Sequence, residues 1–261
     1  MKYFFVLLFV IIILIGFWSV FVEPNLLVVR NITVENPYLR DLKIVFASDF
    51  HVKPYETYRL KRTINLINKQ NPDIILLGGD YVNGHKPGFT LSPEKIAENL
   101  SHLKSKYGTV AIMGNHDGWQ GKFKIIKALE KYGITVLENE NKDFGKFTIA
   151  GVKDLQTSSP DIQKAMFGVG SPVILLTHTP DVFPEVPQGV ALTLAGHLHG
   201  GQIVFPNGRV LTVPSKYGTR YLYGLKKEND KLIYITNGLG TSILPVRFNC
   251  VPEIVVINFA K

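Results

Sequence analysis

The sequence predicts an α/β domain in a four-layer α-β-β-α arrangement, with a hydrophobic transmembrane helix before it. An uncharged apolar run covers residues 3–22. Short β-rich runs then alternate with stretches of helical periodicity, as in α/β domains. The later part of the chain is richer in strand patterns, so we expect a second sheet packed on the first, with helices on the outer faces.

The apolar run at the N-terminus predicts a membrane anchor. At helical rise, about twenty residues span roughly 30 Å, the thickness of the hydrocarbon core of a bilayer. A cleaved signal peptide is the alternative, but the run is long and no small-x-small cleavage site follows it. We therefore expect an anchor, a linker and a folded domain at residues 1–22, 23–41 and 42–261.

The charges beside this run bear on its orientation. Lys2 and the terminal amine favour a cytoplasmic N-terminus, which places the domain outside. Arg30, Arg40 and Lys43 favour the opposite orientation. We expect a single-pass protein of the cell membrane with an extracytoplasmic domain, and a cytoplasmic domain is the alternative.

Composition restricts the class of partner. The formal net charge of +8 suits an anionic partner, such as a phosphorylated substrate or an anionic lipid surface. Lys and Arg are scattered without a long basic block, so no nucleic-acid partner is expected. Cys250 is the only cysteine, which excludes an intramolecular disulfide, and we expect it to be a small structural residue.

Secondary structure follows from the apolar runs and their spacing. Aliphatic and β-branched runs predict strands at residues 43–48, 73–77, 109–113, 147–151, 173–177, 191–195, 232–236 and 253–258. Helical spacing predicts helices at residues 58–69, 93–103, 123–131 and 160–167.

Polar side chains that can bind metal ions follow the predicted strands. Ligands of α/β sheets usually bind at the carboxyl ends of strands. Because residues i and i+2 of an extended strand point the same way, Asp49 and His51 are expected to reach one ion together, as are His197 and His199. The full set is Asp49-Phe50-His51, Asp80, Asn115-His116-Asp117, His178 and His197-Leu198-His199.

The combination is more specific than any one motif. Asp-x-His alone is more often a cap or turn, and a lone histidine after a strand is usually a satisfied polar residue. Five of the seven histidines nevertheless lie in these motifs. Mixed Asp, Asn and His ligands suit Mn²⁺, Fe or Zn²⁺ better than Ca²⁺. His85 and His102 follow no clear strand and are expected to be solvated or structural, although His85 is close enough to Asp80 to line the pocket.

The motifs resemble those of the calcineurin-like metallophosphoesterase superfamily, over roughly residues 42–258. Later segments resemble its bacterial membrane-anchored YkuE/YaeI-type branch, which includes enzymes that cleave UDP-2,3-diacylglucosamine. These segments are Gly200-Gly201-Gln202, Pro214-Ser215-Lys216-Tyr217-Gly218, Gly238-Leu239-Gly240-Thr241-Ser242 and Pro245-Val246-Arg247-Phe248.

The resemblance implies two divalent metal ions, Mn²⁺ first, with Zn²⁺ or Fe as alternatives. Asp80 would bridge the ions, and hydroxide between them would attack phosphorus. It implies that His116 assists the leaving oxygen and that Asp117 orients His116. The implied ligands are Asp49, His51, Asp80 and His199 for the first ion, and Asp80, Asn115, His178 and His197 for the second.

The expected activity is hydrolysis of a phosphodiester or pyrophosphate bond. The substrate would be a phosphorylated small molecule, lipid or envelope component, with UDP-2,3-diacylglucosamine and a cell-envelope phosphodiester as the two named possibilities. Lys216, Arg220 and Arg247 are candidate phosphate contacts, with solvated surface charge as the alternative for each, and Asp154 is a further pocket candidate. A non-catalytic metal-binding membrane scaffold is the alternative function.

Overall fold

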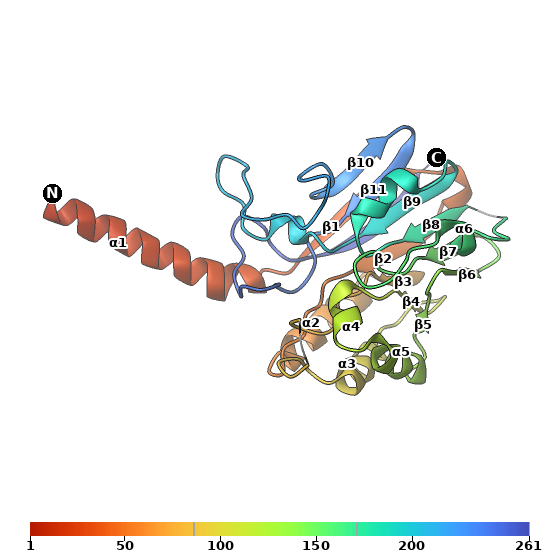
Figure 1. The fold of residues 1–261 in the computed structure, drawn as a ribbon, viewed down its shortest axis with the longest axis horizontal. Helices are drawn as coiled ribbons and strands as arrows, with labels where there is room; N and C mark the ends of the chain where they lie inside the picture. The colour runs from red at the N-terminus through yellow and green to blue at the C-terminus, as the bar shows by residue number, and fades with distance from the viewer. Residues whose placement is uncertain (86, 171, 261) are drawn as a thin grey trace.

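Two sheets lie face to face, and the long N-terminal helix extends to one side of them (Figure 1). This arrangement is seen in a computed structural model that describes residues 1–85, 87–170 and 172–260. Each sheet has six strands, and helices cover the two outer faces. The predicted four-layer α/β fold is therefore confirmed.

The first sheet has the strand order β1-β12-β2-β3-β4-β5. Strands β2 to β5 are parallel, β12 runs antiparallel to β2, and β1 runs parallel to β12. The bounds are β1 (Val28–Glu35), β2 (Lys43–Ala47), β3 (Ile74–Leu77), β4 (Thr109–Ala111), β5 (Thr135–Val136) and β12 (Glu253–Ala260).

The second sheet has the strand order β10-β11-β9-β8-β7-β6. Its four central strands are parallel, and β6 and β10 are antiparallel strands at the two edges. The bounds are β6 (Glu140–Asp143), β7 (Thr148–Gly151), β8 (Val173–Leu176), β9 (Val190–Ala195), β10 (Gly224–Glu228) and β11 (Lys231–Ile235).

Helices pack on the outer faces through one apolar side each. Leu60, Ile64 and Ile67 of α2 lie on one side of that helix and pack in the same core as Val45 and Ile75. The first sheet is covered by α2 (Thr57–Asn68), α3 (Pro93–Leu100) and α5 (Lys122–Lys131), and the second by α6 (Ile162–Ala165) and the 3₁₀ helix Pro180–Glu185. The short α4 (Asn115–Trp119) follows β4.

The core between the sheets is built by alternation along the strands. Ile44 and Phe46 of β2 point to this central core, whereas Val45 between them points to the helices. Ile174 and Leu176 of β8 fill it from the second sheet. Because both faces of these strands are buried, their sequences are continuously hydrophobic. These hydrophobic runs are the pattern from which the strands were predicted.

The prediction that residues 23–41 form a linker is wrong for the central part of this segment. Residues 28–35 form β1, which pairs with β12 along its whole length. As an edge strand, β1 keeps Arg30, Asn31 and Glu35 exposed, so its sequence lacks the hydrophobic run of a buried strand.

The helix at the N-terminus projects away from the sheets (Figure 1). It begins as α1 (Lys2–Phe17) and continues through further helical turns to Asn25. In the described part of the chain it is the one helix long and apolar enough to cross a membrane, with 24 residues and an 18-residue window of mean hydropathy 3.1.

A core substitution tests the packing of the two sheets. Ile257 of β12 is fully buried between them, so Ile257→Ala should lower the free energy of unfolding by about 2–5 kcal/mol. Leu225→Ala, on the half-exposed edge strand β10, is the matched control and should cost much less. Urea unfolding followed by circular dichroism measures both, and equal losses would contradict this packing.

Candidate metal centre

The predicted polar motifs meet at one edge of the two sheets, where the parallel strands end. Asp49 and His51 follow β2, Asp80 follows β3, and His178 follows β8. Asn115 and His116 begin α4, while His197 and His199 follow β9. All of these side chains are buried.

The backbone of these motifs is not extended, contrary to the expected i, i+2 alternation. Asp49, His51, His197 and His199 all have φ between 42° and 72°, in the left-handed region that non-glycine residues rarely adopt. Each such residue typically costs about 1–3 kcal/mol and persists where surrounding structure fixes it. At the first pair, the Asp49 N–H donates to Gly79 O at 3.0 Å and the His51 N–H to Asp80 O at 2.9 Å.

Two glycines allow Asp80 to approach the neighbouring loop. A Cβ on Gly79 would lie 2.4 Å from the backbone nitrogen of Gly114. A Cβ on Gly114 would lie 2.2 Å from Oδ1 of Asp80. Both positions therefore exclude any side chain, and Gly79 also has a φ of 93°.

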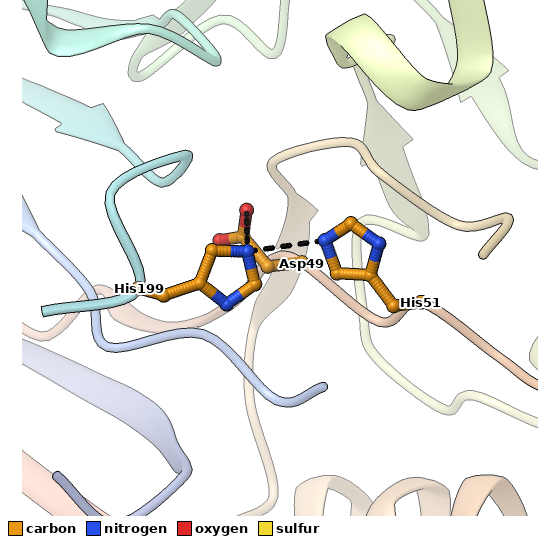
Figure 2. A group of neighbouring side chains, drawn as sticks. All are labelled: Asp49, His51 and His199. Atoms are coloured by element: carbon orange, nitrogen blue, oxygen red, sulfur yellow. Dashed lines mark hydrogen bonds and ion pairs between the residues drawn. The ribbon is translucent and has the colours of Figure 1, made fainter. Parts of the chain in front are cut away.

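Asp49, His51 and His199 form the first group of donors, and their polar atoms turn toward one another (Figure 2). The Nε2 atoms of His51 and His199 lie 3.1 Å apart, and Oδ1 of Asp49 lies 3.6 Å from His199 Nε2. Oδ2 of Asp80 lies 3.4 Å from His51 Nε2, so Asp80 adjoins this group.

The electrostatics of the first group suit a cation. Burial lowers the pKa of His51 to about 3 and that of His199 well below its usual value, so both rings are neutral at pH 7. Burial also raises the pKa of Asp49 to about 6, and its Oδ2 has no hydrogen-bond partner among the described residues. Neutral imidazoles beside a buried carboxylate are a donor set that Mn²⁺, Fe or Zn²⁺ would take.

Asp80, Asn115, His178 and His197 form the second group of donors. Oδ2 of Asp80 lies 3.3 Å from His178 Nε2, and Oδ1 of Asn115 lies 2.9 Å from both His178 Nε2 and His197 Nδ1. Burial opposes the charge on His178, but the Asp80 and Asp49 carboxylates raise its pKa well above the usual value. Without a metal ion, Asp80 and His178 therefore form a buried ion pair.

His116 lies beside both groups and is held by a contact that the sequence did not reveal. Its Nδ1 is 2.7 Å from Gly84 O, so this nitrogen donates and Nε2 carries the lone pair. Its ring packs edge-on to His51, with 4.5 Å between the centroids. A nitrogen of His116 also falls in a group of possible donors with His51 and Asp80.

The expected role of Asp117 is wrong, because its carboxylate does not contact the ring of His116. It accepts backbone N–H bonds from Asp80, Tyr81 and Gly114 at 2.8–2.9 Å. Asp117 therefore fixes the loop that carries Asp80, and the Gly84 carbonyl orients His116.

Gln156 was not predicted, and it adjoins His197. Its side-chain amide lies 2.9 Å from His197 Nε2 and can hold the ring so that Nδ1 faces Asn115. The carboxylate of Asp154 holds this turn by accepting the N–H groups of Gln156 and Thr157. A glutamine within a turn carries no sequence signal for such a role.

A cavity of about 340 Å³ opens over the two groups. Its walls include the described residues His85, Trp119, Gln156, Leu198, Gln202, Ile203, Leu211, Thr212, Pro214, Ser242, Ile243 and Leu244. His85 stacks on Trp119 at 4.8 Å between centroids, which confirms that it lines the pocket. Leu198 also forms part of the wall. No Lys or Arg is among the described lining residues.

The three predicted phosphate contacts therefore lie elsewhere. Arg247 is fully buried, and its guanidinium donates to the carbonyls of Gly240, Asn237 and Cys250, so its assignment as a substrate contact is wrong. Arg220 pairs with Glu228 at 2.7 Å on the surface, and exposed Lys216 does not line the cavity. Charge alone did not distinguish a structural arginine from a substrate contact.

Comparison with known proteins identifies close relatives of the whole domain. A sequence profile of the calcineurin-like phosphoesterase family matches residues 42–201. The chain is 33% identical over 253 residues to the uncharacterized metallophosphoesterase YkuE of Bacillus subtilis, covering 91% of this chain and 87% of that protein. It is 34% identical over 230 residues to the phosphodiesterase YaeI of Escherichia coli, covering 83% and 81%. The resemblance to the YkuE/YaeI-type branch is confirmed.

Other relatives are longer than this chain. It is 27% identical over 241 residues to a transmembrane protein with metallophosphoesterase domain of Danio rerio, covering 83% of this chain and 52% of that protein. It spans 60% of a Helicobacter pylori metallophosphoesterase to which it is 32% identical over 237 residues.

Replacing Arg247 tests its structural role. Arg247→Ala leaves several buried carbonyls without a donor and should lower the free energy of unfolding by about 3–5 kcal/mol. Lys216→Ala, on the surface, is the control and should unfold like the parent. Denaturant unfolding of both variants measures this, and unchanged stability of Arg247→Ala with lost activity would instead support a substrate contact.

Metal affinity should rise with pH. Metal ions bind the ionised carboxylate and neutral imidazoles, whereas Asp49 has a pKa of about 6 and His178 a raised pKa. The ionised fraction of Asp49 alone rises roughly tenfold between about pH 5 and pH 7. Calorimetric titration of the full chain with Mn²⁺ should show tighter binding at the higher pH. Asp49→Asn should bind more weakly with a shallower pH dependence, and an affinity independent of pH in the parent would contradict these assignments.

Proposed function

Because this chain belongs to the calcineurin-like phosphoesterase family, we propose that it is a two-metal phosphoesterase that cleaves phosphodiester bonds at a membrane. The observation that carries the proposal is the position of Asp80 between two groups of buried donors. Its Oδ2 lies 3.4 Å from His51 Nε2 and 3.3 Å from His178 Nε2.

We assign the two groups to two divalent ions. Asp49, His51, Asp80 and His199 would hold one ion, and Asp80, Asn115, His178 and His197 the other. The nitrogen and oxygen donors suit Mn²⁺, with Zn²⁺ or Fe as alternatives. Two ions bound here would lower the pKa of a water molecule and offset the negative charge of the phosphoryl oxygens.

His116 is the proposed proton donor to the leaving oxygen. Gly84 O holds Nδ1, so a proton gained on Nε2 would face the cavity, near Ser242 Oγ at 3.4 Å. The backbone N–H of His116 also donates to Asp80 Oδ1 at 2.8 Å, which fixes the distance of the ring from the metal groups. A donor held in place in this way typically contributes a factor of about 10²–10⁴ to the rate.

The wall of the cavity favours a phosphodiester over a nucleotide pyrophosphate. Its described lining residues include no Lys or Arg, so these residues leave the phosphate charge to be balanced by the metal ions. A diester carries one negative charge at neutral pH and needs less compensation than a pyrophosphate. The E. coli relative is named a phosphodiesterase, which agrees with this choice. UDP-2,3-diacylglucosamine remains the competing substrate, with its base able to stack on the aromatic pair His85 and Trp119.

The N-terminal helix supports a membrane location. Its 24 residues exceed the length that a bilayer core requires, and nearly all of its side chains are exposed. A relative from Danio rerio is named a transmembrane protein. We propose a single-pass anchor with the domain outside the cell membrane, on the basis of Lys2 and the terminal amine. A non-catalytic scaffold is less well supported, because both donor groups and His116 share one open cavity.

Substitutions of Asp80 and His116 distinguish the proposed metal bridge from the proposed proton donor. With Mn²⁺ and bis(p-nitrophenyl) phosphate, Asp80→Ala should abolish turnover because both ions lose a ligand. His116→Ala should lower kcat by about 10²–10⁴ while binding as much Mn²⁺ as the parent. Turnover is read from p-nitrophenolate absorbance and bound metal from mass spectrometry. Full activity of Asp80→Ala would refute the bridge, and loss of Mn²⁺ in His116→Ala would make His116 a ligand.

A further inference from the structure

The mouth of the cavity carries a group of exposed apolar side chains. Phe205, Leu211, Ile243 and Leu244 are 45%, 57%, 80% and 47% exposed, and we call these four residues the apolar rim. Three of them line the cavity, and Phe205 lies in the neighbouring turn. Contiguous apolar side chains at a cavity mouth mark a binding surface more often than scattered ones do.

The rim comes from two segments that are bonded into one unit. Gln202 donates from Nε2 to the carbonyls of Ser242 and Leu244, both at 3.1 Å, and its Oε1 accepts the Ser242 N–H at 2.8 Å. Val204 pairs with Val210, which closes the turn that carries Phe205. The two segments that carry these four side chains are therefore held in a defined arrangement beside the cavity.

The same unit is attached to the end of the N-terminal helix. The Arg247 N–H donates to Ser19 O at 2.9 Å, and the Cys250 N–H donates to the carboxylate of Glu23. Ser19 and Glu23 are both buried. In Figure 1, the blue segments between β9 and β10 and before β12 project on the side of the domain from which α1 extends. A bilayer spanned by α1 would therefore adjoin the rim.

The charge of these two segments suits an anionic lipid surface. Residues 201–222 and 237–252 contain no Asp or Glu. Arg209 and Lys216 lie in the first segment and are exposed, whereas Arg220 of this segment pairs with Glu228 of β10. Apolar side chains with basic residues around them are the composition of surfaces that bind at the membrane interface.

We propose that the apolar rim lies in the bilayer beside α1, so that the cavity opens onto the membrane surface and takes the head group of an amphiphilic phosphodiester. The substrate part of this inference rests on the proposed function, whereas the contact of the rim with lipid does not. An amphiphile would keep its acyl chain in the lipid against the rim while its phosphate reaches the Asp80 centre. The absence of Lys and Arg among the described residues of the wall suits this substrate, because those residues leave its single charge to the metal ions.

Lipid contact is tested with a fluorescent probe on the full chain in phospholipid vesicles. Phe205→Cys carries an NBD label at the rim, and Phe167→Cys, 84% exposed beyond α6, carries it at the control position. The natural Cys250 is buried and should not react with the label. Treating the parent chain with the same NBD reagent checks this. With doxyl-labelled phospholipid in the vesicles, NBD emission at 205 should fall about twofold or more, and emission at 167 should stay unchanged. Equal emission changes at the two positions would overturn the proposal.

The substrate class is tested with two chromogenic diesters that differ only in the length of their alkyl group. Water cleaves either p-nitrophenyl hexadecyl phosphate or p-nitrophenyl methyl phosphate into p-nitrophenol and an alkyl phosphate. With Mn²⁺ in mixed micelles, the parent should show kcat/KM about tenfold or more higher for the hexadecyl diester. Phe205→Ser should lower this ratio, and Phe167→Ser, beyond α6, should leave it unchanged. Equal kcat/KM for both diesters would overturn the amphiphile, whereas no turnover of either would instead refute the proposed function.

Discussion

Asp80 places a carboxylate in the interior within 3.4 Å of rings from two separate histidine groups, and much of the local structure holds it there. Its backbone has a φ of 55°, and its N–H donates to the buried carboxylate of Asp117. Gly114 leaves room for it by having no side chain. A buried charge is costly unless it is paired, so the contacts of Asp80 with His51 and His178 stabilise the fold as well as forming the proposed centre.

A second set of buried charges connects the N-terminal helix to this centre. Glu23 accepts the Cys250 N–H, and the Cys250 thiol donates to the carbonyl of His199 at 3.1 Å. Arg247 belongs to the same set. Its guanidinium donates to buried backbone carbonyls, and its backbone N–H donates to the carbonyl of Ser19. The end of the helix is therefore bonded to the loop that carries a proposed metal ligand. This gives the proposed anchor a defined position relative to the cavity, which a flexible linker would not.

The sequence predicted the buried strands well, because burial on both faces leaves a continuous hydrophobic run. It missed β1, β6 and β10, which lie at sheet edges and expose polar residues, and the two-residue β5. It located the donors at strand ends, but it expected extended backbone at Asp49 and His197 where φ is positive. It also misassigned Asp117 and Arg247, because a charged residue type does not reveal whether its partners are backbone groups or a substrate.

The sequence by itself determined the identity and order of the proposed metal donors, the family, and the apolar N-terminal helix, since each is recorded in residue types and local spacing. Only the tertiary structure decided which donors meet. His51 and His199 are 148 positions apart and come within 3.1 Å because the two sheets end at a common edge. The composition of the described part of the cavity wall, the carbonyl that orients His116, and the grouping of the apolar rim were decided in the same way. Each depends on loops packing against one another, and local patterns contain no information about that packing.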